Sequence, residues 1–424
     1  MTNNPKMARL LLISVAFATL VICLSLPDIF KAKPRGNPFS EQFVTRKIEY
    51  DAKGSAPRGG FLPLPPEYVH RFPDSAYRSN PGWQGIVLST IRRSLFMPVE
   101  NFIPTAKVGF SVLFFVSFFM FFLFVSRALS SRLSIIAAAS YAIVSSVLYA
   151  FSSNLYWVTF LFFLGPLLIF FVRSKHDVLS PERLRAVFLV SASSVFIKSL
   201  CGYEWVSFFI LNNAWAVAFL LLSSTRQNQL ATTVSALVKV VLCGAAGFFL
   251  AVLVHLVQGY VAYADLQQAL DPILSRMLAH AGAVSKANEL FTTFQAPEHA
   301  YPSATLSNAL SPYLKQKMFV PVTTALPFFA AFVIAMSLVA MKSRLFNFID
   351  GKKALPLRPL LLLTLLSYIP PLSWLVLQPS HALVHPHINI VMFAAISFPL
   401  TLIALLEGTK AVLADGIARG HRPR

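Results

Sequence analysis

Long apolar runs constrain this chain more than any other feature. A bilayer core needs about 20 apolar residues per helix, and runs of this kind recur along the whole sequence. Of the 424 residues, 56% are hydrophobic and only 12% are charged. A soluble protein of this length could not shield so much apolar surface from water. The sequence therefore predicts an all-α polytopic membrane protein, folded as a single membrane-embedded domain over residues 1–424.

About ten transmembrane helices are expected. The first follows Lys6 and Arg9 and resembles a signal peptide, but no A-x-A-like cleavage site follows it, so it is expected to remain as an anchor. Between the fifth and sixth spans, residues 202–204 must form a tight turn. The spans lie near Met7–Leu26, Val108–Leu129, Leu133–Phe151, Leu155–Val172, Ala186–Cys201, Trp205–Leu222, Val238–Tyr260, Phe319–Met341, Leu360–Leu377 and Ile388–Leu406.

The connections between these spans alternate in charge. The short members of one set are residues 152–154, 202–204 and 378–387, which contain no Lys or Arg. The positive-inside rule therefore places both termini in the cytoplasm and predicts a multi-pass protein of the inner (plasma) membrane. The other set is basic and carries Lys6, Arg9, Arg127, Arg132, Arg173, Lys175, Arg183, Arg185, Arg226, Lys342, Arg344, Lys352, Lys353, Arg358, Lys410, Arg419, Arg422 and Arg424.

The formal net charge of +19 does not indicate a nucleic-acid partner. Basic cytoplasmic loops orient membrane proteins, and basic surfaces attract anionic membrane lipids or phosphate-bearing substrates. No basic patch interleaved with aromatic residues stands apart from the apolar segments. The three cysteines, Cys23, Cys201 and Cys243, lie in apolar segments without a CxxC spacing. That pattern is typical of small core residues.

Two long connections, residues 27–107 and 261–317, are expected on the extracytoplasmic side. The first is rich in Pro and Gly, so its beginning is expected to be irregular. Its end, Trp83–Phe96, has apolar residues at roughly helical spacing and predicts an amphipathic helix along the outer membrane surface. This helix would either anchor the loop or face a substrate. The second loop predicts a helix at Ala264–Ala281.

Ionisable groups inside membrane spans cost about 2.5–3.5 kcal/mol each and usually face an internal cavity. Lys198 and Glu204 bracket the tight turn at residues 202–204. Glu204 can serve as a general base, as an acceptor for a hydroxyl or as a metal ligand, and Tyr203 beside it is a candidate substrate contact. The structural alternative is a Lys198–Glu204 ion pair at the membrane interface, with Tyr203 and Trp205 as interfacial aromatic residues.

Three histidines, His381, His385 and His387, lie at the outer end of the ninth and tenth spans, and Asn389 follows them. Pro386 disfavours one continuous helix and predicts a turn that enters a new helix. The cluster could bind phosphate through protonated imidazoles, transfer protons or hold a metal ion. The alternative is interfacial histidines satisfied by water. No metal ligand is assigned, because no acidic residue lies beside the cluster, and a divalent metal is only an optional cofactor.

Two further polar groups are predicted on the same side of the membrane. His255 and Gln258 lie one helical turn apart at the outer end of the seventh span. Asn80-Pro81-Gly82 is a turn signal just before the surface helix. Either group could be purely structural. If the turn faces a substrate, the side chains that could contact a phosphate or sugar hydroxyls are Arg78, Asn80 and Gln84.

In layout the chain resembles the GT-C superfamily of membrane glycosyltransferases. The segments YRSNPGWQG, KSLCGYEW and HALVHPHIN also look like segments of uncharacterised multi-pass proteins from bacterial polysaccharide clusters. The resemblance implies many spans, a large first outer loop with membrane-surface helices, and an active site at the outer membrane face. It also implies a sugar donor carried on a polyprenyl phosphate.

The acidic residues of the first outer loop depart from the GT-C pattern. Enzymes of that superfamily usually carry an Asp or a paired acid early in this loop, whereas here Asp28 follows the first span directly. The candidate catalytic bases are therefore Glu204 and an acid of the loop, for which Asp74 is chosen because it flanks the Asn80 turn. Other acids are scattered along the loop, among them Glu41, Glu49 and Asp51.

These features predict a glycosyltransferase that uses a lipid-linked sugar donor and a glycan or lipid acceptor at the extracytoplasmic face. A carboxylate would deprotonate the acceptor hydroxyl, and an apolar groove would hold the prenyl tail. The cations that could stabilise the leaving phosphate are His381, His385, His387, Lys198 and Arg78.

The main alternative is a transporter or flippase for a lipid-linked glycan or an ion, because intramembrane Lys, Glu and His also suit a permeation path. The clustering of these groups at one face and the lack of a paired internal repeat argue against transport. A membrane acyltransferase with a buried histidine is a third, less favoured hypothesis.

Overall fold

The computed structural model describes residues 38–53, 80–129, 131, 133–172, 180–223, 230–290, 304–315, 317–319, 323–324 and 357–420. These residues are almost entirely helical. The predicted first span lies outside them, and so does the eighth except at its start, where Phe319 and Thr323–Thr324 are extended and not helical. Within the described part of the chain, the one pairing of extended segments is antiparallel and joins β1 (Lys317–Phe319) to β2 (Thr323–Thr324).

Five of the described helical segments are long and apolar enough to cross a membrane: Val99–Ala128, Glu182–Cys201, Thr232–Tyr263, Pro359–Leu377 and Ile388–Lys410. Three shorter apolar helices correspond to predicted spans, namely Leu133–Val144, Thr159–Val172 and Val206–Leu222. The chain is thus an α-helical membrane protein, and the count of ten spans stays a prediction.

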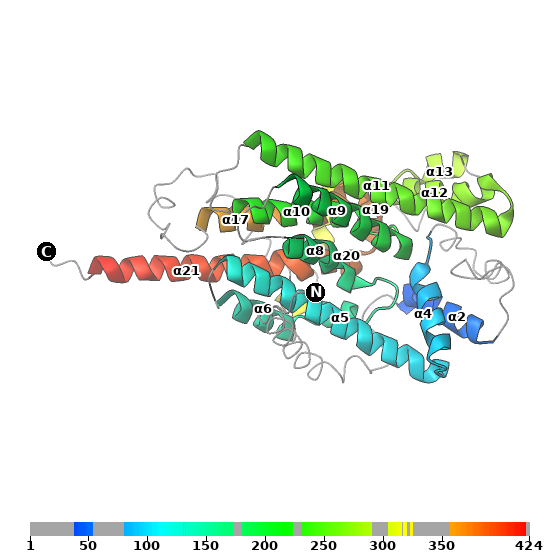
Figure 1. The fold of residues 1–424 in the computed structure, drawn as a ribbon, viewed down its shortest axis with the longest axis horizontal. Coiled ribbons are helices and arrows are strands. Elements are labelled where there is room, and N and C mark those ends of the chain that lie inside the picture. The colour runs from blue at the N-terminus through cyan, green and yellow to red at the C-terminus, as the bar shows by residue number, and fades with distance from the viewer. Residues whose placement is uncertain are drawn as a thin grey trace.

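The helices lie along one long axis with their connections at its two ends (Figure 1). The long helices are α5 (Val99–Ala128), α9 (Pro181–Cys201), α10 (Val206–Leu222), α11 (Leu230–Tyr263) and α21 (Phe398–Gly420). Shorter segments complete the bundle: α6 (Leu133–Val144), α7 (Ser146–Ser152), η3 (Thr159–Phe163), α8 (Leu164–Val172), α17 (Leu357–Leu366), α18 (Ile369–Leu377), α19 (Pro379–Val384), α20 (Pro386–Met392) and η5 (Phe393–Ser397).

Of the helices that the two predicted outer loops contribute, α2, α4, α12 and α13 lie at one end of this axis, while the C-terminal end of α21 lies at the other (Figure 1). The helix α12 confirms the one predicted at Ala264–Ala281. The loop helices are α2 (Pro38–Ala52), α4 (Trp83–Ser94), α12 (Leu266–His280), α13 (Val284–Leu290) and α14 (Leu306–Leu314).

Small residues let the helices approach closely. A Cβ added at Gly247 of α11 would lie 2.1 Å from the carbonyl oxygen of Ala192 on α9. One at Gly165 of α8 would lie 1.9 Å from the side-chain oxygen of Asn213 on α10. Without a hydrophobic force between helices in lipid, such close packing and interhelical hydrogen bonds hold a membrane bundle together.

The outward face of α11 is apolar along its length. Leu242 is 62% exposed and Leu253 is 58% exposed, and further exposed residues on this helix are Val234, Val238, Phe249, Leu250 and Val257. In water such a surface would be a large liability. In a bilayer it is the ordinary lipid-facing surface of a helix whose backbone groups are all paired internally.

The prediction that the first loop begins irregularly is wrong for residues 38–52, which form α2. Phe43, Val44 and Ile48 are buried on one side of this helix. Lys47 also points inward and pairs with Asp51 one turn later, at 2.8 Å. The Pro-rich composition of the loop hid this amphipathic stretch, because its prolines lie on either side of it.

The surface helix α4 forms as predicted, with an apolar exposed face and a polar buried face. Its apolar residues Val87, Ile91 and Leu95 are exposed, whereas the polar residues Gln84 and Ser89 are buried against the protein. An apolar outer face suits contact with lipid. The polar inner face lies beside the site described below.

Two predicted spans have different ends in the structure. The third breaks at Ser145, whose hydroxyl accepts from the backbone N–H of Leu148 at 3.4 Å and so caps a new helix. The fourth begins with an irregular segment, because the Asn154 side chain accepts from the backbone N–H groups of Tyr156 and Trp157. Such a side-chain turn competes with helix formation.

Candidate functional site

The predicted tight turn between α9 and α10 is present. Gly202 has φ 150°, and a Cβ there would lie 2.5 Å from Oε2 of Glu204. Only glycine therefore lets the glutamate side chain fold back over the turn. Trp205 follows with φ 64°, a left-handed conformation that bulky residues rarely adopt. Strain of this kind is typical of a segment that tertiary packing holds in place.

Lys198 supports this turn from below. Its ammonium donates to the carbonyl oxygens of Gly202 at 3.1 Å and of Glu204 at 3.4 Å. A cation at the C-terminal end of α9 also complements the unpaired carbonyls and the helix dipole there. Among the ion pairs of the described residues, none joins Lys198 to the Glu204 carboxylate. The ion pair considered from the sequence is therefore replaced by bonds to the backbone.

The Glu204 carboxylate is 9% exposed and is held by two neutral donors. Its Oε1 accepts from the Tyr156 hydroxyl at 2.8 Å and from the Asn80 amide at 3.1 Å. That amide also donates to the Tyr156 hydroxyl oxygen at 3.0 Å. A buried carboxylate with neutral partners keeps its charge available for a ligand or a proton, at a substantial desolvation cost.

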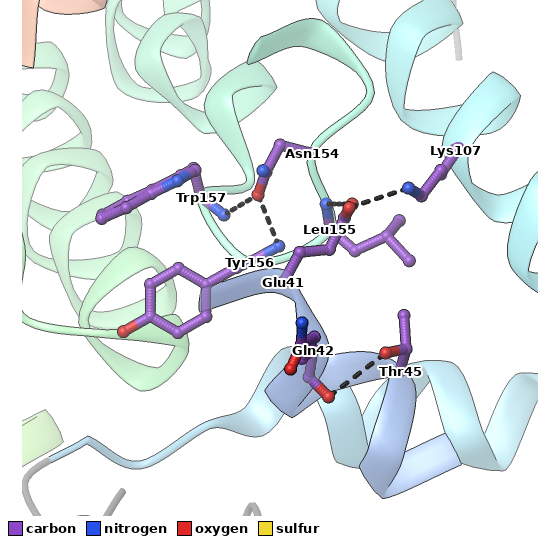
Figure 2. Close-up of polar contacts among 8 residues, drawn as sticks. All are labelled: Glu41, Gln42, Thr45, Lys107, Asn154, Leu155, Tyr156 and Trp157. Carbon is purple, nitrogen blue, oxygen red and sulfur yellow. Dashed lines mark hydrogen bonds and ion pairs between the residues drawn. The ribbon is translucent and has the colours of Figure 1, made fainter. Parts of the chain in front are cut away.

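A second buried acid fixes the segment that carries Tyr156 (Figure 2). Glu41 of α2 accepts from the backbone N–H of Leu155 at 3.1 Å through Oε1, and its Oε2 pairs with Lys107 of α5 at 2.7 Å. Next to it, Asn154 accepts from the N–H groups of Tyr156 and Trp157. The first loop and α5 thereby place the Tyr156 hydroxyl on Glu204.

Helix α11 and helix α4 fix the turn at residues 80–82. The Gln258 amide donates to the carbonyl oxygen of Pro81 at 3.1 Å. Gln84 donates to the carbonyl oxygen of Tyr156 at 3.4 Å, and the Asn80 side chain accepts from the backbone N–H of Tyr203 at 3.4 Å. Two sequence-predicted residues, Gln84 and Gln258, therefore position others in the site.

Tyr203 connects the turn to His255. The Tyr203 hydroxyl and the imidazole Nδ1 of His255 lie 2.8 Å apart, and His255 is 2% exposed. Burial raises the pKa of Tyr203, and the Glu204 charge raises that pKa further. Tyr203 thus stays a neutral phenol at any physiological pH.

The histidine cluster packs against the same turn. His381 in α19 lies 4.9 Å from His385 between ring centroids, and α20 begins at Pro386 as predicted. Asn389 approaches the His381 ring at 3.4 Å and accepts from the indole N–H of Trp205 at 2.6 Å. Trp205 is completely buried, so it is a core residue and not the interfacial aromatic residue of the structural alternative.

His280 at the end of α12 extends this cluster. Its ring centroid lies 4.6 Å from that of His381. Burial lowers the pKa of His280 well below its usual value, and Arg276, His381 and His385 lower that pKa further. His280 is therefore neutral at pH 7. Within the described residues, no group of three His, Cys, Asp or Glu side chains is arranged to hold a metal ion.

A partly open pocket lies over the turn, with about 450 Å³ of empty space that includes the solvent at its mouth. Glu204 and Arg276 contribute opposite charges to its wall, from the α9–α10 turn and from α12. Six residues predicted from the sequence do not line the pocket and lie behind the residues that do: Lys198, His255, Gln258, His381, His385 and Asn389. The pocket is lined by Asn80, Tyr203, Glu204, Val206, Phe248, Ile273, Arg276, Met277, His280, Trp374 and Gln378.

Three predicted residues are not placed by the structure: Asp74, Arg78 and the side chain of His387 lie outside the described residues. Sequence reasoning missed several others. Tyr156 lies two residues after Asn154, at the start of the predicted fourth span, and His280 lies at the end of the predicted loop helix, so both carried a weak signal. Arg276, Trp374 and Gln378 carried none, because helix packing alone turns them toward Glu204.

The segments that meet here come from five separate connections, which the charge pattern had put on one side of the membrane. Comparison of the chain with protein-family models, curated proteins and solved structures finds no match. Function is therefore inferred from the chemistry of the site itself.

Proposed function

We propose that this chain is an integral membrane glycosyltransferase. It would transfer a sugar from a polyprenyl-phosphate-linked donor to an acceptor hydroxyl at the extracytoplasmic face of the inner membrane, in the assembly or modification of cell-surface glycan. The observation that carries the proposal is the position of Glu204. This residue is buried, its carboxylate is held by neutral donors, and it lines a pocket whose wall also contains a cation.

The proposed base is Glu204. Its Oε1 is fixed by Tyr156 and Asn80, and the same side chain lines the pocket. In the reaction the carboxylate takes the proton of the acceptor hydroxyl while the acceptor oxygen attacks the anomeric carbon. The bond from that carbon to the phosphate oxygen breaks, and the polyprenyl phosphate leaves with the electron pair. General base catalysis of this kind typically contributes roughly 10²–10⁴-fold.

The leaving phosphate needs a cation in the pocket. Arg276 lines the pocket and is half-buried, so its guanidinium can stabilise the charge that develops on the phosphate. Lys198 is a weaker candidate than the sequence suggested, because its ammonium is committed to the carbonyl oxygens of the turn. In this proposal Lys198 positions Glu204, and Arg276 takes the electrostatic role.

The prenyl tail needs an apolar path from the pocket to the bilayer. Phe248 and Met277 line the pocket, and Met277 is exposed. Beside Phe248, Phe249 faces outward on the apolar surface of α11. A lipid-linked donor could therefore keep its tail in the membrane while its head group occupies the pocket.

The test is mass spectrometry of surface glycan and lipid-linked intermediates from cells that lack the protein. Complementation uses wild-type protein and Glu204→Gln. We expect the deletion strain to lack one sugar in its glycan and to accumulate the lipid-linked donor. The Glu204→Gln variant should behave like the deletion at wild-type protein level.

Full restoration of the glycan by Glu204→Gln would refute the role of Glu204, and an unchanged glycan in the deletion strain would refute the glycosyltransferase. A complete oligosaccharide trapped on its carrier at the cytoplasmic leaflet would instead favour the flippase.

A further inference from the structure

Near the end of α18, two buried polar atoms of the pocket wall have no hydrogen-bond partner among the described residues. They are the indole N–H of Trp374 and the side-chain carbonyl oxygen of Gln378. Both residues line the pocket, and Trp374 is 97% buried, with 3% of its surface exposed. An unpaired buried donor or acceptor costs about 1–3 kcal/mol. A ligand in this pocket can complete the bonding of both atoms.

The arrangement of these atoms indicates the kind of ligand. Trp374 and Gln378 lie one turn apart at the end of α18, where the backbone N–H of Gln378 donates to the carbonyl oxygen of Trp374 at 2.8 Å. One side chain offers a donor and the other an acceptor. A hydroxyl both accepts and donates, so a ligand with neighbouring hydroxyls can satisfy both atoms.

The rest of the pocket wall has an apolar side and a cationic side, which suit a ligand with a neutral part and an anionic part. Phe248, Ile273 and Met277 give the pocket an apolar side on which the C–H face of a ring can rest. Arg276 is a cation on the α12 side. Its neighbour His280 is a neutral imidazole, so the anion falls to the guanidinium.

We infer that this pocket binds a glycosyl phosphate, with ring hydroxyls on Trp374 Nε1 and Gln378 Oε1 and the phosphate on Arg276. The inference rests on the proposed function, since it names the donor head group that the same site would recognise. It puts the anomeric carbon between the phosphate at Arg276 and the carboxylate of Glu204. The two orphaned atoms then determine which sugar is accepted, because a ring without the matching hydroxyl leaves them unpaired.

The test measures binding to the purified full-length protein in detergent by isothermal titration calorimetry. The probes are inorganic phosphate and the 1-phosphates of glucose, galactose, mannose and N-acetylglucosamine. We expect at least one hexose 1-phosphate to bind 10-fold or more tightly than inorganic phosphate. Trp374→Phe keeps the ring and removes only the N–H, and it should reduce that preference to about 3-fold or less. Gln378→Ala should do the same.

Two controls make the result interpretable. Trp215→Phe removes an indole N–H that bonds to the carbonyl oxygen of Leu363 away from the pocket, and it should keep the sugar preference. Arg276→Gln should weaken both phosphate and hexose 1-phosphates by 10-fold or more.

The inference is overturned if no hexose 1-phosphate binds more tightly than phosphate, or if both Trp374→Phe and Gln378→Ala retain the preference. Should one variant fail to fold, the other decides. The glycan of Glu204→Gln cells tests the proposed function separately, so a glycosyltransferase with a different donor pocket would lose activity there and still fail the binding test.

Discussion

Two buried glutamates, Glu41 and Glu204, have opposite surroundings. Glu41 pairs with Lys107 at 2.7 Å and accepts from a backbone N–H, so its charge is balanced within the protein. Glu204 accepts from a phenol and an amide and lines a pocket. Both are almost fully buried. Burial alone therefore does not indicate function; the partners of the carboxylate do.

The comparison extends to the other described acids of the first loop. Asp51 pairs with Lys47 at 2.8 Å and lies 3.7 Å from Arg93, and Glu49 is exposed. Each of these carboxylates has a cation or water to satisfy it. Compared with Glu41, Glu49 and Asp51, Glu204 alone combines burial, neutral partners and a pocket.

The largest expected difference is in activity. Glu204→Gln should reduce transfer by roughly 10²–10⁴-fold, the range for loss of a general base. Glu41→Gln keeps an acceptor for the Leu155 N–H that holds the Tyr156 segment, so it should reduce activity mainly in proportion to the loss of folded protein. Activity per folded molecule, with folding measured by size-exclusion chromatography, checks both. Equal losses of activity per folded molecule in the two variants would contradict the proposed difference in role between the two carboxylates.

The free energy of unfolding should show the reverse order, with a larger loss in Glu41→Gln than in Glu204→Gln. Glu41→Gln leaves Lys107 without its partner, and since Lys107 is 24% exposed, we expect a loss of about 2 kcal/mol, below the 3–5 kcal/mol of a fully buried broken pair. The double variant Glu41→Gln/Lys107→Met should recover part of this loss. Denaturant titration in detergent measures it, and a double variant less stable than Glu41→Gln would contradict the ion pair.

The donors to Glu204 should have an intermediate effect. Tyr156→Phe and Asn80→Ala each remove one hydrogen bond to the carboxylate, and we expect about 10-fold lower activity, the equivalent of about 1.4 kcal/mol. Asn154→Ala loosens the turn that carries Tyr156 without touching Glu204 and serves as the positioning control. Its loss should largely disappear in a Tyr156→Phe background, which a double-mutant cycle on kcat/KM would show. If the activity losses of Asn154→Ala and Tyr156→Phe simply add, Asn154 does not act on Glu204 through Tyr156.

The smallest effect concerns His280, which forms the neutral part of the wall facing Glu204. Its pKa is depressed in the folded protein, so the unfolded chain binds more protons below pH 6.5. Stability should therefore fall by roughly 1 kcal/mol between pH 6.5 and 5.5 and be intact above that range. His280→Gln should flatten this dependence in thermal unfolding. A slope unchanged by the substitution would assign the acid sensitivity to other groups.

Sequence reasoning located the elements of the site better than its chemistry. Hydropathy and alternating charge depend on local composition, so they indicated the Gly202–Glu204 turn, the helix α12 and the break at Pro386. The partners of each side chain depend on packing between distant segments. Neither the bonding of Lys198 to backbone carbonyls nor the contact between Tyr156 and Glu204 could follow from spacing along the chain.

The outer-loop acids show the same limit. From the sequence, Glu41 and Asp51 were scattered acids of the loop, and Asp74 was preferred as a candidate base only for its place beside the Asn80 turn. Folding distinguishes Glu41 and Asp51 from a catalytic base, because α2 pairs Glu41 with Lys107 and Asp51 with Lys47. Asp74 lies outside the described residues and stays a prediction.

The central claim is that the Glu204 pocket opens to the extracytoplasmic side, where a lipid-linked donor would be used. Cysteine labelling in intact cells with a membrane-impermeant maleimide tests it directly, after Cys23, Cys201 and Cys243 are replaced by Ala. Met277→Cys samples the exposed rim of the pocket, and Lys410→Cys, at an exposed position of α21, samples the opposite end of the bundle. We expect Met277→Cys to label in intact cells and Lys410→Cys to label only after permeabilisation. The reverse pattern would put the pocket in the cytoplasm and contradict the account.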